Sequence, residues 1–280
     1  MIKKSTTVAL VALSLILTSC ASNKEKTTND KISTPNKMEM SMDGHAHALG
    51  DGTQSEVDGF KLAILSGNAK TKEEFDLRLA VYKGENTVNN MVTTHEEKMH
   101  LILVDEYLSE YLHLHPKLNE DSTWSVKVKF PTGGKWRVIS DFTLENEEGA
   151  KQNYILGERL EVSGDFVRSE LPEPTDSLTV NGYELKVSGS IKTGDHGMLM
   201  ITVQKDGKPA KLEPYMGALG HLVAIRAEDG AYAHFHPHES AMESMLHFMT
   251  EVPGPGKYRL FLQFKVDGVI NLAALTADVI

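Results

Sequence analysis

A group of three histidines occurs twice in this chain with the same internal spacing. The two groups are His100, His113 and His115, and His221, His234 and His236. In each copy 13 positions separate the first two histidines, and all three histidines recur after 121 positions. Neutral imidazole is the commonest protein ligand for transition metals. The duplicated spacing therefore predicts that one or both groups bind a metal ion.

The flanking sequence predicts that strands position these histidines. Apolar and mostly polar residues alternate in segments 75–81, 124–130 and 260–266. Gly, Pro, Asn and Asp bound many short segments of this kind, which is typical of an all-β antiparallel sandwich. On an extended segment His113 and His115 project from one face, and a turn at 105–110 would bring His100 beside them. The second group has the same arrangement, with a turn at 228–230.

The repeat extends over nearly the whole C-terminal part of the chain. Segment 57–64 aligns with 180–187, and segment 130–137 aligns with 252–259 after one inserted residue. Each half has about 100 residues, the usual size of one domain. We therefore expect two tandem β-sandwich domains, 57–170 and 176–280, with the boundary near Pro174.

The N-terminus predicts export and lipidation. Lys3 and Lys4 precede an apolar run, 8–17, that is too short to span a bilayer stably. Leu-Thr-Ser-Cys follows and ends at Cys20, which resembles the bacterial lipoprotein signal. That resemblance implies cleavage after residue 19 and a fatty acid such as palmitate on Cys20. The alternative is an ordinary secretory signal. Either way we expect the cell envelope, with the protein facing the periplasm or the exterior and, if lipidated, anchored to a membrane.

Composition narrows the chemistry and the partners. Cys20 is the only cysteine, so the exported chain has no internal disulfide and no second thiolate for a metal site. The formal charge is -10, and loss of residues 1–19, with two lysines and no acids, makes it about -12. A surface this acidic disfavours nucleic acid as a partner and tolerates cations.

Segment 20–56 is expected to be a disordered tether, because it has few branched apolar residues. Soft-metal ligands gather within it: Met38, Met40, Met42, His45 and His47. Thioethers suit Cu(I), and imidazole accepts Cu(I), Cu(II) or Zn(II), so the mixture favours copper, with zinc as the alternative. A polar linker with chance methionines is the other interpretation.

Further residues near the two groups are candidate auxiliary ligands. They are His95 and Met99 in the first half and His238 in the second. Segment 239–248 could form a short helix or a loop. At helical spacing Met242, Met245 and Met249 would share one face, which favours core packing slightly over ligation.

The His-x-His-Pro segments, the preceding strand histidines and the Phe-Pro-Thr-Gly-Gly-Lys-Trp segment at 130–136 resemble a family of bacterial envelope proteins. These proteins have cupredoxin-like or YtkA-like sandwiches of immunoglobulin type, and several accompany copper and heavy-metal handling systems. The resemblance implies copper handling, with a metal transporter or chaperone as a partner. Blue-copper electron transfer is not expected, since that centre needs a Cys thiolate beside its two histidines.

Three functions follow from these observations. The leading hypothesis is a lipid-anchored envelope protein that binds copper for sequestration, resistance or delivery. A metalloenzyme that uses an open coordination position is the second. The third is an adhesive or protein-binding sandwich module whose histidines are structural. No general base stands out beside the histidines, so binding is favoured over catalysis.

Overall fold

Two β-sandwiches form from the alternating segments, in a computed structural model that describes residues 48–194, 196–238 and 242–280. Within these ranges the chain contains strands and no helix. No segment of the described part is a helix long and apolar enough to cross a membrane. The expected signal, Cys20, and the Met/His segment 38–47 lie outside the described residues.

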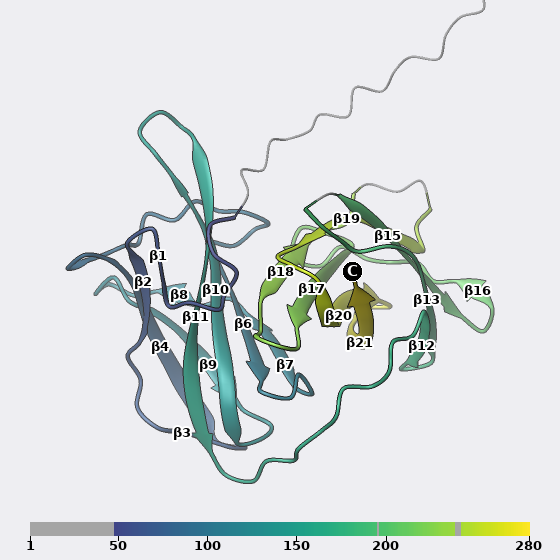
Figure 1. Cartoon of the computed structure of the whole chain (residues 1–280), viewed down its shortest axis with the longest axis horizontal. Helices are drawn as coiled ribbons and strands as arrows, with labels where there is room; N and C mark the ends of the chain where they lie inside the picture. Colours follow the sequence, from purple (N-terminus) through teal and green to yellow (C-terminus); the bar gives the residue numbers. More distant parts are fainter. Residues whose placement is uncertain (1–47, 195, 239–241) are drawn as a thin grey trace, which may run out of the picture. The chain divides into compact units, whose positions relative to one another are not determined.

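The first half consists of two facing sheets (Figure 1). One has the order β1-β2-β4-β9-β8, with β5 beside β4, and the other has the order β3-β11-β10-β6-β7. The bounds are β1 Glu56–Val57, β2 Phe60–Ile64, β3 Ala69–Lys70, β4 Glu74–Lys83, β5 Asn86–Thr87, β6 Met99–Asp105, β7 Tyr111–Leu114, β8 Lys117–Leu118, β9 Trp124–Lys129, β10 Gly134–Glu145 and β11 Lys151–Ser163.

The second half repeats this plan. One sheet has the order β12-β13-β15-β19-β14, with β16 beside β15, and the other has the order β18-β17-β20-β21. The bounds are β12 Ser177–Val180, β13 Tyr183–Gly189, β14 Lys192–Thr193, β15 Gly197–Lys205, β16 Lys208–Pro209, β17 Gly220–Arg226, β18 Tyr232–Phe235, β19 Met245–Val252, β20 Gly256–Val266 and β21 Val269–Val279. The predicted all-β sandwich fold is confirmed. All pairings are antiparallel except the short β3/β11 and β14/β19 pairs.

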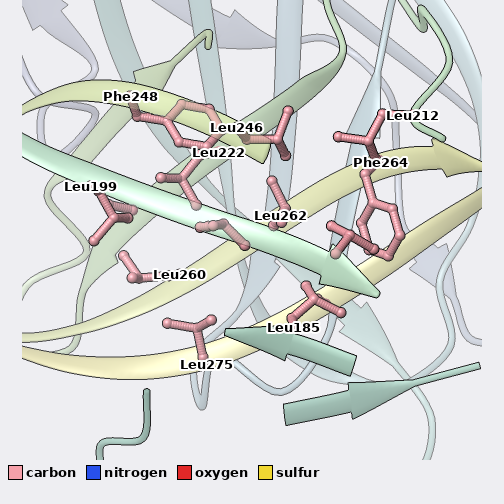
Figure 2. Close-up of a cluster of buried hydrophobic side chains, with 14 of the residues drawn as sticks. Leu185, Leu199, Leu212, Leu222, Leu246, Phe248, Leu260, Leu262, Phe264 and Leu275 are labelled. Carbon is pink, nitrogen blue, oxygen red and sulfur yellow. The ribbon is translucent and has the colours of Figure 1, made fainter. Parts of the chain in front are cut away.

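Each sandwich has its own apolar core. In the second half every other residue of β13, β15, β19 and β20 points inward, and leucines and phenylalanines from these strands interdigitate (Figure 2). Large aromatic residues fill the first core, among them Trp124, Trp136 and Phe142. Burial of a side chain of this size contributes about 1.5–3 kcal/mol, so these two clusters hold the sheets in place.

A third apolar cluster joins the two halves. It combines Ile102, Val104 and Tyr111 of the first half with residues of the second, including Val223 and Phe261. The ring of Tyr111 stacks on that of Phe261 at 4.4 Å between centroids. Residues of β6 and β17 therefore have apolar environments on both faces, and all described residues belong to one compact unit.

The structure corrects the expectation for segment 239–248. Residues 245–252 form strand β19, and Met245 and Met249 lie on the face opposite to the buried Leu246 and Phe248. Met242 is 52% exposed and is not a core residue. Residues 239–241 are outside the described part. The buried residues Leu246, Phe248 and Thr250 recur every two positions, as in a strand, and not every 3.6 positions, as in a helix.

Part of the expected tether packs on the first sandwich. The Leu49 amide donates to the Asn153 carbonyl at 2.9 Å, and the Ile155 amide donates to the Leu49 carbonyl at 2.9 Å. A Cβ on Gly157 would lie 1.7 Å from the Gly52 carbonyl oxygen, so only glycine permits this approach. Residues 49–54 thus run along β11.

Candidate metal centre

Strand register assembles the first triad, His100, His113 and His115. In the β6/β7 hairpin Leu101 is opposite Leu114 and Ile102 is opposite His113. This register puts His115, just past the strand end, across from His100. All three rings project from the face that carries Ile102, and one nitrogen from each lies within 4.8 Å of the other two. The structure thus contains the predicted antiparallel hairpin and the predicted shared face of the three rings.

Strands β17 and β18 assemble the second triad, His221, His234 and His236, in the same way. Leu222 is opposite Phe235 and Val223 is opposite His234. One nitrogen from each of these rings also lies within 4.8 Å of the other two. His100 and His221 are 3% and 1% exposed, so each triad begins inside the protein.

A backbone carbonyl fixes the tautomer of the first histidine in each triad. Nε2 of His100 lies 3.3 Å from the Thr94 carbonyl oxygen, and Nε2 of His221 lies 2.9 Å from that of Tyr215. A carbonyl only accepts hydrogen bonds, so Nε2 carries the proton in both rings. Nδ1 of both rings consequently has a free lone pair.

The second histidine in each triad is oriented by a residue from the other half. Nδ1 of His113 lies 2.9 Å from Oε1 of Gln263, to which it donates. Nδ1 of His234 faces Oδ2 of Asp141 at 3.7 Å, and the Tyr232 hydroxyl donates to the same oxygen at 2.9 Å. Asp141 pairs with His100 across β10/β6, and Gln263 pairs with His221 across β20/β17, so they occupy equivalent positions.

Two lone pairs therefore face each other in each triad. Nδ1 of His100 is 3.0 Å from Nε2 of His113, and Nδ1 of His221 is 3.4 Å from Nε2 of His234. Two neutral acceptors at this distance repel unless a proton or a cation lies between them. Two nitrogens bound at about 2.0–2.1 Å to one tetrahedral ion are roughly 3.3–3.4 Å apart. The second triad matches this spacing at 3.4 Å, and the pair in the first triad, at 3.0 Å, would open by about 0.3–0.4 Å to hold the ion.

The third histidine in each triad adds an unpaired nitrogen. Nε2 of His115 and Nε2 of His236 are buried and have no hydrogen-bond partner. Nδ1 of His115 is 3.4 Å from Oε1 of Glu97. Buried polar atoms normally have partners, so these two equivalent nitrogens are available as metal ligands.

The environment favours the neutral form of five imidazoles of the two triads. Burial, reinforced by neighbouring imidazoles, lowers the pKa of His115 to about 4. Burial likewise lowers the pKa of His221 to about 4, opposed by the Tyr215 carbonyl. The pKa values of His113, His234 and His236 are also lowered, first by burial and then by the adjacent rings. Neutral imidazole is the form that binds metal.

The two triads form one cluster of six rings. Between halves, the ring centroid of His234 lies 5.3 Å from that of His100 and 5.5 Å from that of His113. Within the first triad the His100 and His113 centroids are also 5.3 Å apart. Histidine rings from different halves are thus as close to each other as rings within the first triad. We call these six residues the histidine cluster.

Two equivalent turns lie beside the histidine cluster. Thr94 bridges Glu97, and Tyr215 bridges Ala218. Their central residues are His95 and Glu96 in the first turn (φ 51° and 71°) and Met216 and Gly217 in the second (φ 53° and 75°). This left-handed backbone is unfavourable for non-glycine residues.

The first of these turns reaches the second triad. The His95 ring stacks on that of His236 at 3.5 Å and 20°. A Cβ on Gly217 would lie 3.2 Å from Cγ of Glu96, so the two turns touch. His95 thus contacts both triads: it stacks on His236 of the second, and its ring is edge-on to that of His100 of the first at 6.5 Å between centroids, the triad with which the sequence associated it.

The remaining predicted ligands lie elsewhere. Met99 is 1% exposed within the first sandwich core, on the face of β6 opposite to His100, because neighbouring strand residues alternate. His238 bridges His247 of β19 and belongs to a different sheet from the second triad. Met38, Met40, Met42, His45 and His47 lie outside the described residues.

Gln263 is the functional residue that the sequence interpretation missed. Asp141, at the equivalent position of the first half, was not predicted as a histidine partner either. The signal was in the repeat: both residues are polar positions of a long apolar strand, and the register places each opposite the first histidine of its own half. Their reciprocal contacts cross between halves, which no local pattern encodes.

Comparisons with solved structures show distant likeness only. The E. coli adhesin FdeC is 12% identical over 83% of this chain and 66% of that chain, with a TM-score of 0.26. The chicken CNTN1 FN1–FN3 domains are 11% identical over 78% of this chain and 66% of that one, with a TM-score of 0.21. The chain spans 57%, 49% and 66% of the first three matched structures. Such values support no statement about function.

A family comparison is more specific. No curated protein matches the chain. The model of a domain of unknown function, DUF8832, matches residues 55–154 and again residues 178–280. The first match covers the first sandwich up to the start of β11, the second covers the second sandwich, and together they span well over half of the sequence. The chain therefore belongs to the DUF8832 family and carries two copies of its domain.

Proposed function

We propose that this protein binds copper at the histidine cluster and holds it in the cell envelope for sequestration, resistance or delivery. The observation that carries the proposal is the facing pair of imidazole lone pairs in each triad, at 3.0 and 3.4 Å. A cation between the nitrogens replaces repulsion with coordination. The buried orphan nitrogens of His115 and His236 supply further ligand atoms.

Each part of the cluster has a distinct task in this proposal. His100, His113 and His115, with the three histidines of the second triad, hold the copper as cargo. Gln263 accepts a hydrogen bond from Nδ1 of His113, and the Asp141 carboxylate faces Nδ1 of His234 at 3.7 Å, so in both rings Nε2 is directed at the ion. Outer partners of this kind set ring orientation and ligand basicity.

Copper is favoured over zinc by the rest of the chain. An all-imidazole set accepts Cu(I), Cu(II) and Zn(II) alike. The segment 38–47 adds three thioethers, which select Cu(I). The resemblance to cupredoxin-like and YtkA-like envelope proteins also favours copper. It further implies a metal transporter or chaperone as the partner that donates or receives the ion.

Metal analysis tests the proposal directly. The untagged full chain, extracted from membranes in mild detergent, is expected to contain copper, and six His→Gln changes at the cluster should remove most of it. His196→Gln, at an exposed imidazole near Glu251, is the matched control and should retain the metal. If the cluster variant contained as much copper as the wild-type chain, the proposed site would be wrong. If the wild-type chain contained zinc and no copper, the site would stand and the choice of copper would be wrong.

The envelope anchor forms the second part of the proposal. Cys20 carries a lipid and the segment after it links the sandwiches to the membrane. Cys20→Ser is expected to shift the protein from the membrane fraction to the soluble fraction, with the metal content per folded molecule unchanged. Retention of the Cys20→Ser protein in washed membranes would show that another feature holds it there.

A further inference from the structure

A second group of metal-ligating side chains lies on the outer face of the second sandwich, away from its core. Strand β19 alternates: Leu246, Phe248 and Thr250 are buried, while Met245, His247 and Met249 face outward. On the adjacent strand β15, Met198 and Met200 also face outward, and Met198 is 57% exposed.

The register brings these residues together. Met200 is opposite His247, and Met198 is opposite Met249. His238 bridges His247 on its other side, so Met200, His247 and His238 form one row across the sheet. Directly opposed residues have Cβ atoms about 4.5–5.5 Å apart. We call this group the Met/His face: Met198, Met200, His238, Met245, His247 and Met249.

Two of these ligand atoms already touch. Nε2 of His247 is 2.7 Å from Sδ of Met245. The imidazole and the thioether therefore converge on one point above the sheet instead of extending separately into solvent. Met200 and Met249, opposite and next to His247 on the same face, are partly exposed and border that point.

The first sandwich shows that the fold does not require these residue types. In the first sandwich the strand pairings place these residues at the equivalent positions: Asp76, Arg78, Lys117, Thr123, Ser125 and Lys127. That face is solvated and charged: Arg78 pairs with Asp121 at 2.6 Å, and Lys127 pairs with Glu74 at 2.6 Å. All six positions carry Met or His in the second sandwich, and none does in the first.

Methionine normally fills gaps in cores, and on this face it has no core to fill. Thioether sulfur is a soft ligand that prefers Cu(I), and imidazole is compatible with it. Carboxylate and carbonyl oxygens, which hard cations need, are absent from these six side chains. The ligand set therefore selects a soft monovalent cation.

We propose that the Met/His face is a separate binding site for a soft monovalent cation, Cu(I) in its native setting, with Ag(I) as a redox-inert substitute. The site does not depend on the histidine cluster: it uses other residues, another sheet and sulfur ligands. Its exposure suits rapid capture and release, whereas the buried cluster suits retention.

Methyl NMR of the full chain, labelled with ¹³C at the methionine methyl groups, tests this site. Titration with Ag(I) is expected to shift the resonances of Met198, Met200, Met245 and Met249 together, while those of the buried Met91 and Met99 stay fixed. Single Met→Leu variants assign the signals. Methionines of segment 38–42 respond as separate resonances, so their binding does not mask the result.

Two variants make the outcome decisive. The quadruple variant Met198→Leu, Met200→Leu, Met245→Leu and Met249→Leu keeps an apolar face without sulfur and should lose the Ag(I) response of the His247 and His238 rings. Met91→Leu with Met99→Leu is the control and should keep it. In a chain with all six cluster histidines changed to Gln, the methionine shifts should persist, so failure of the cluster and failure of this site are told apart. Fixed methyl resonances at these four methionines in the wild-type chain, up to several equivalents of Ag(I), would overturn the proposal without any variant.

Discussion

The two halves of this protein are alike on one face and different on another. Where they meet, each half presents three histidines from equivalent strand positions, and equivalent residues, Asp141 and Gln263, orient the partner half's ring. On the outer face of the opposite sheet, six equivalent positions are polar or charged in the first half and Met or His in the second.

The contrast separates what the fold requires from what a task requires. Both outer faces are solvated parts of equivalent sheets in the two halves, so packing allows either set of residues. The histidines, by contrast, are retained at buried positions where neutral imidazoles with unpaired nitrogens cost stability. The presence of such unfavourable residues at equivalent positions of both halves supports the proposed metal site.

The largest expected effect comes from breaking the cluster across the halves. His113→Gln and His234→Gln remove rings whose centroids are 5.5 Å apart in different halves. Each change removes a ligand and should lower copper affinity by more than about 100-fold, because outer partners alone are worth roughly 10–100-fold. Contacting groups are coupled, so the double variant should lose less than the product of the two factors.

Competition with a copper chelator measures these affinities in the full chain. His113→Gln combined with His196→Gln, which lies outside the cluster, serves as the additive control. Strict additivity for His113 and His234 would mean that each half binds on its own, and the likeness of the two faces would then be inheritance without a shared centre.

A smaller effect is expected from the residues that cross between halves. Gln263→Ala leaves all six histidines in place but removes the acceptor of the His113 Nδ1 proton. Copper affinity should fall by about 10–100-fold, as for other outer partners of metal-bound histidine. Gln204→Ala, on β15 of the same half, should leave affinity unchanged. An unchanged value for Gln263→Ala would show that His113 needs no partner from the second half.

The sequence predicted the local part of this arrangement and missed the part that spans the halves. Alternation and the His-x-His spacing predicted the strands and the shared face of each triad, since both depend on neighbours within one hairpin. Contacts such as His113 with Gln263, 150 positions apart, arise only when two sheet faces dock. Segment 239–248 was expected to be a short helix or a loop, because the spacing of three and four between Met242, Met245 and Met249 obscured the inward alternation of Leu246 and Phe248.

The likeness of the two triads also predicts how stability responds to acid. The pKa values of His115 and His221, one in each half, are lowered to about 4. The unfolded chain then binds more protons than the folded chain between pH 6.5 and 4, so metal-free stability falls as pH decreases through this range. Urea unfolding of chelator-treated protein at several pH values measures the slope.

Single variants show how much each half contributes to the decrease of stability in acid. His115→Gln and His221→Gln should each flatten the slope, and by similar amounts, since the pKa of each histidine is lowered to about 4. His196→Gln, at a more exposed imidazole, is the control. A slope lost with His221→Gln alone would break the equivalence of the two triads, and a flat wild-type profile would contradict the neutral state of the buried rings.

The smallest effect on stability is expected where the halves differ most. Met198→Asp, Met200→Arg, His247→Ser and Met249→Lys give the outer face of β15 and β19 the residues of β4 and β9. Surface changes away from the core alter stability little, so the free energy of unfolding should change by at most about 1 kcal/mol, while Ag(I) binding at this face is lost. Chemical denaturation and silver titration of the same variant separate these two readings. A large loss of stability would mean that the methionines pack against something essential to the fold, and the difference between the two outer faces would then reflect structure instead of metal capture.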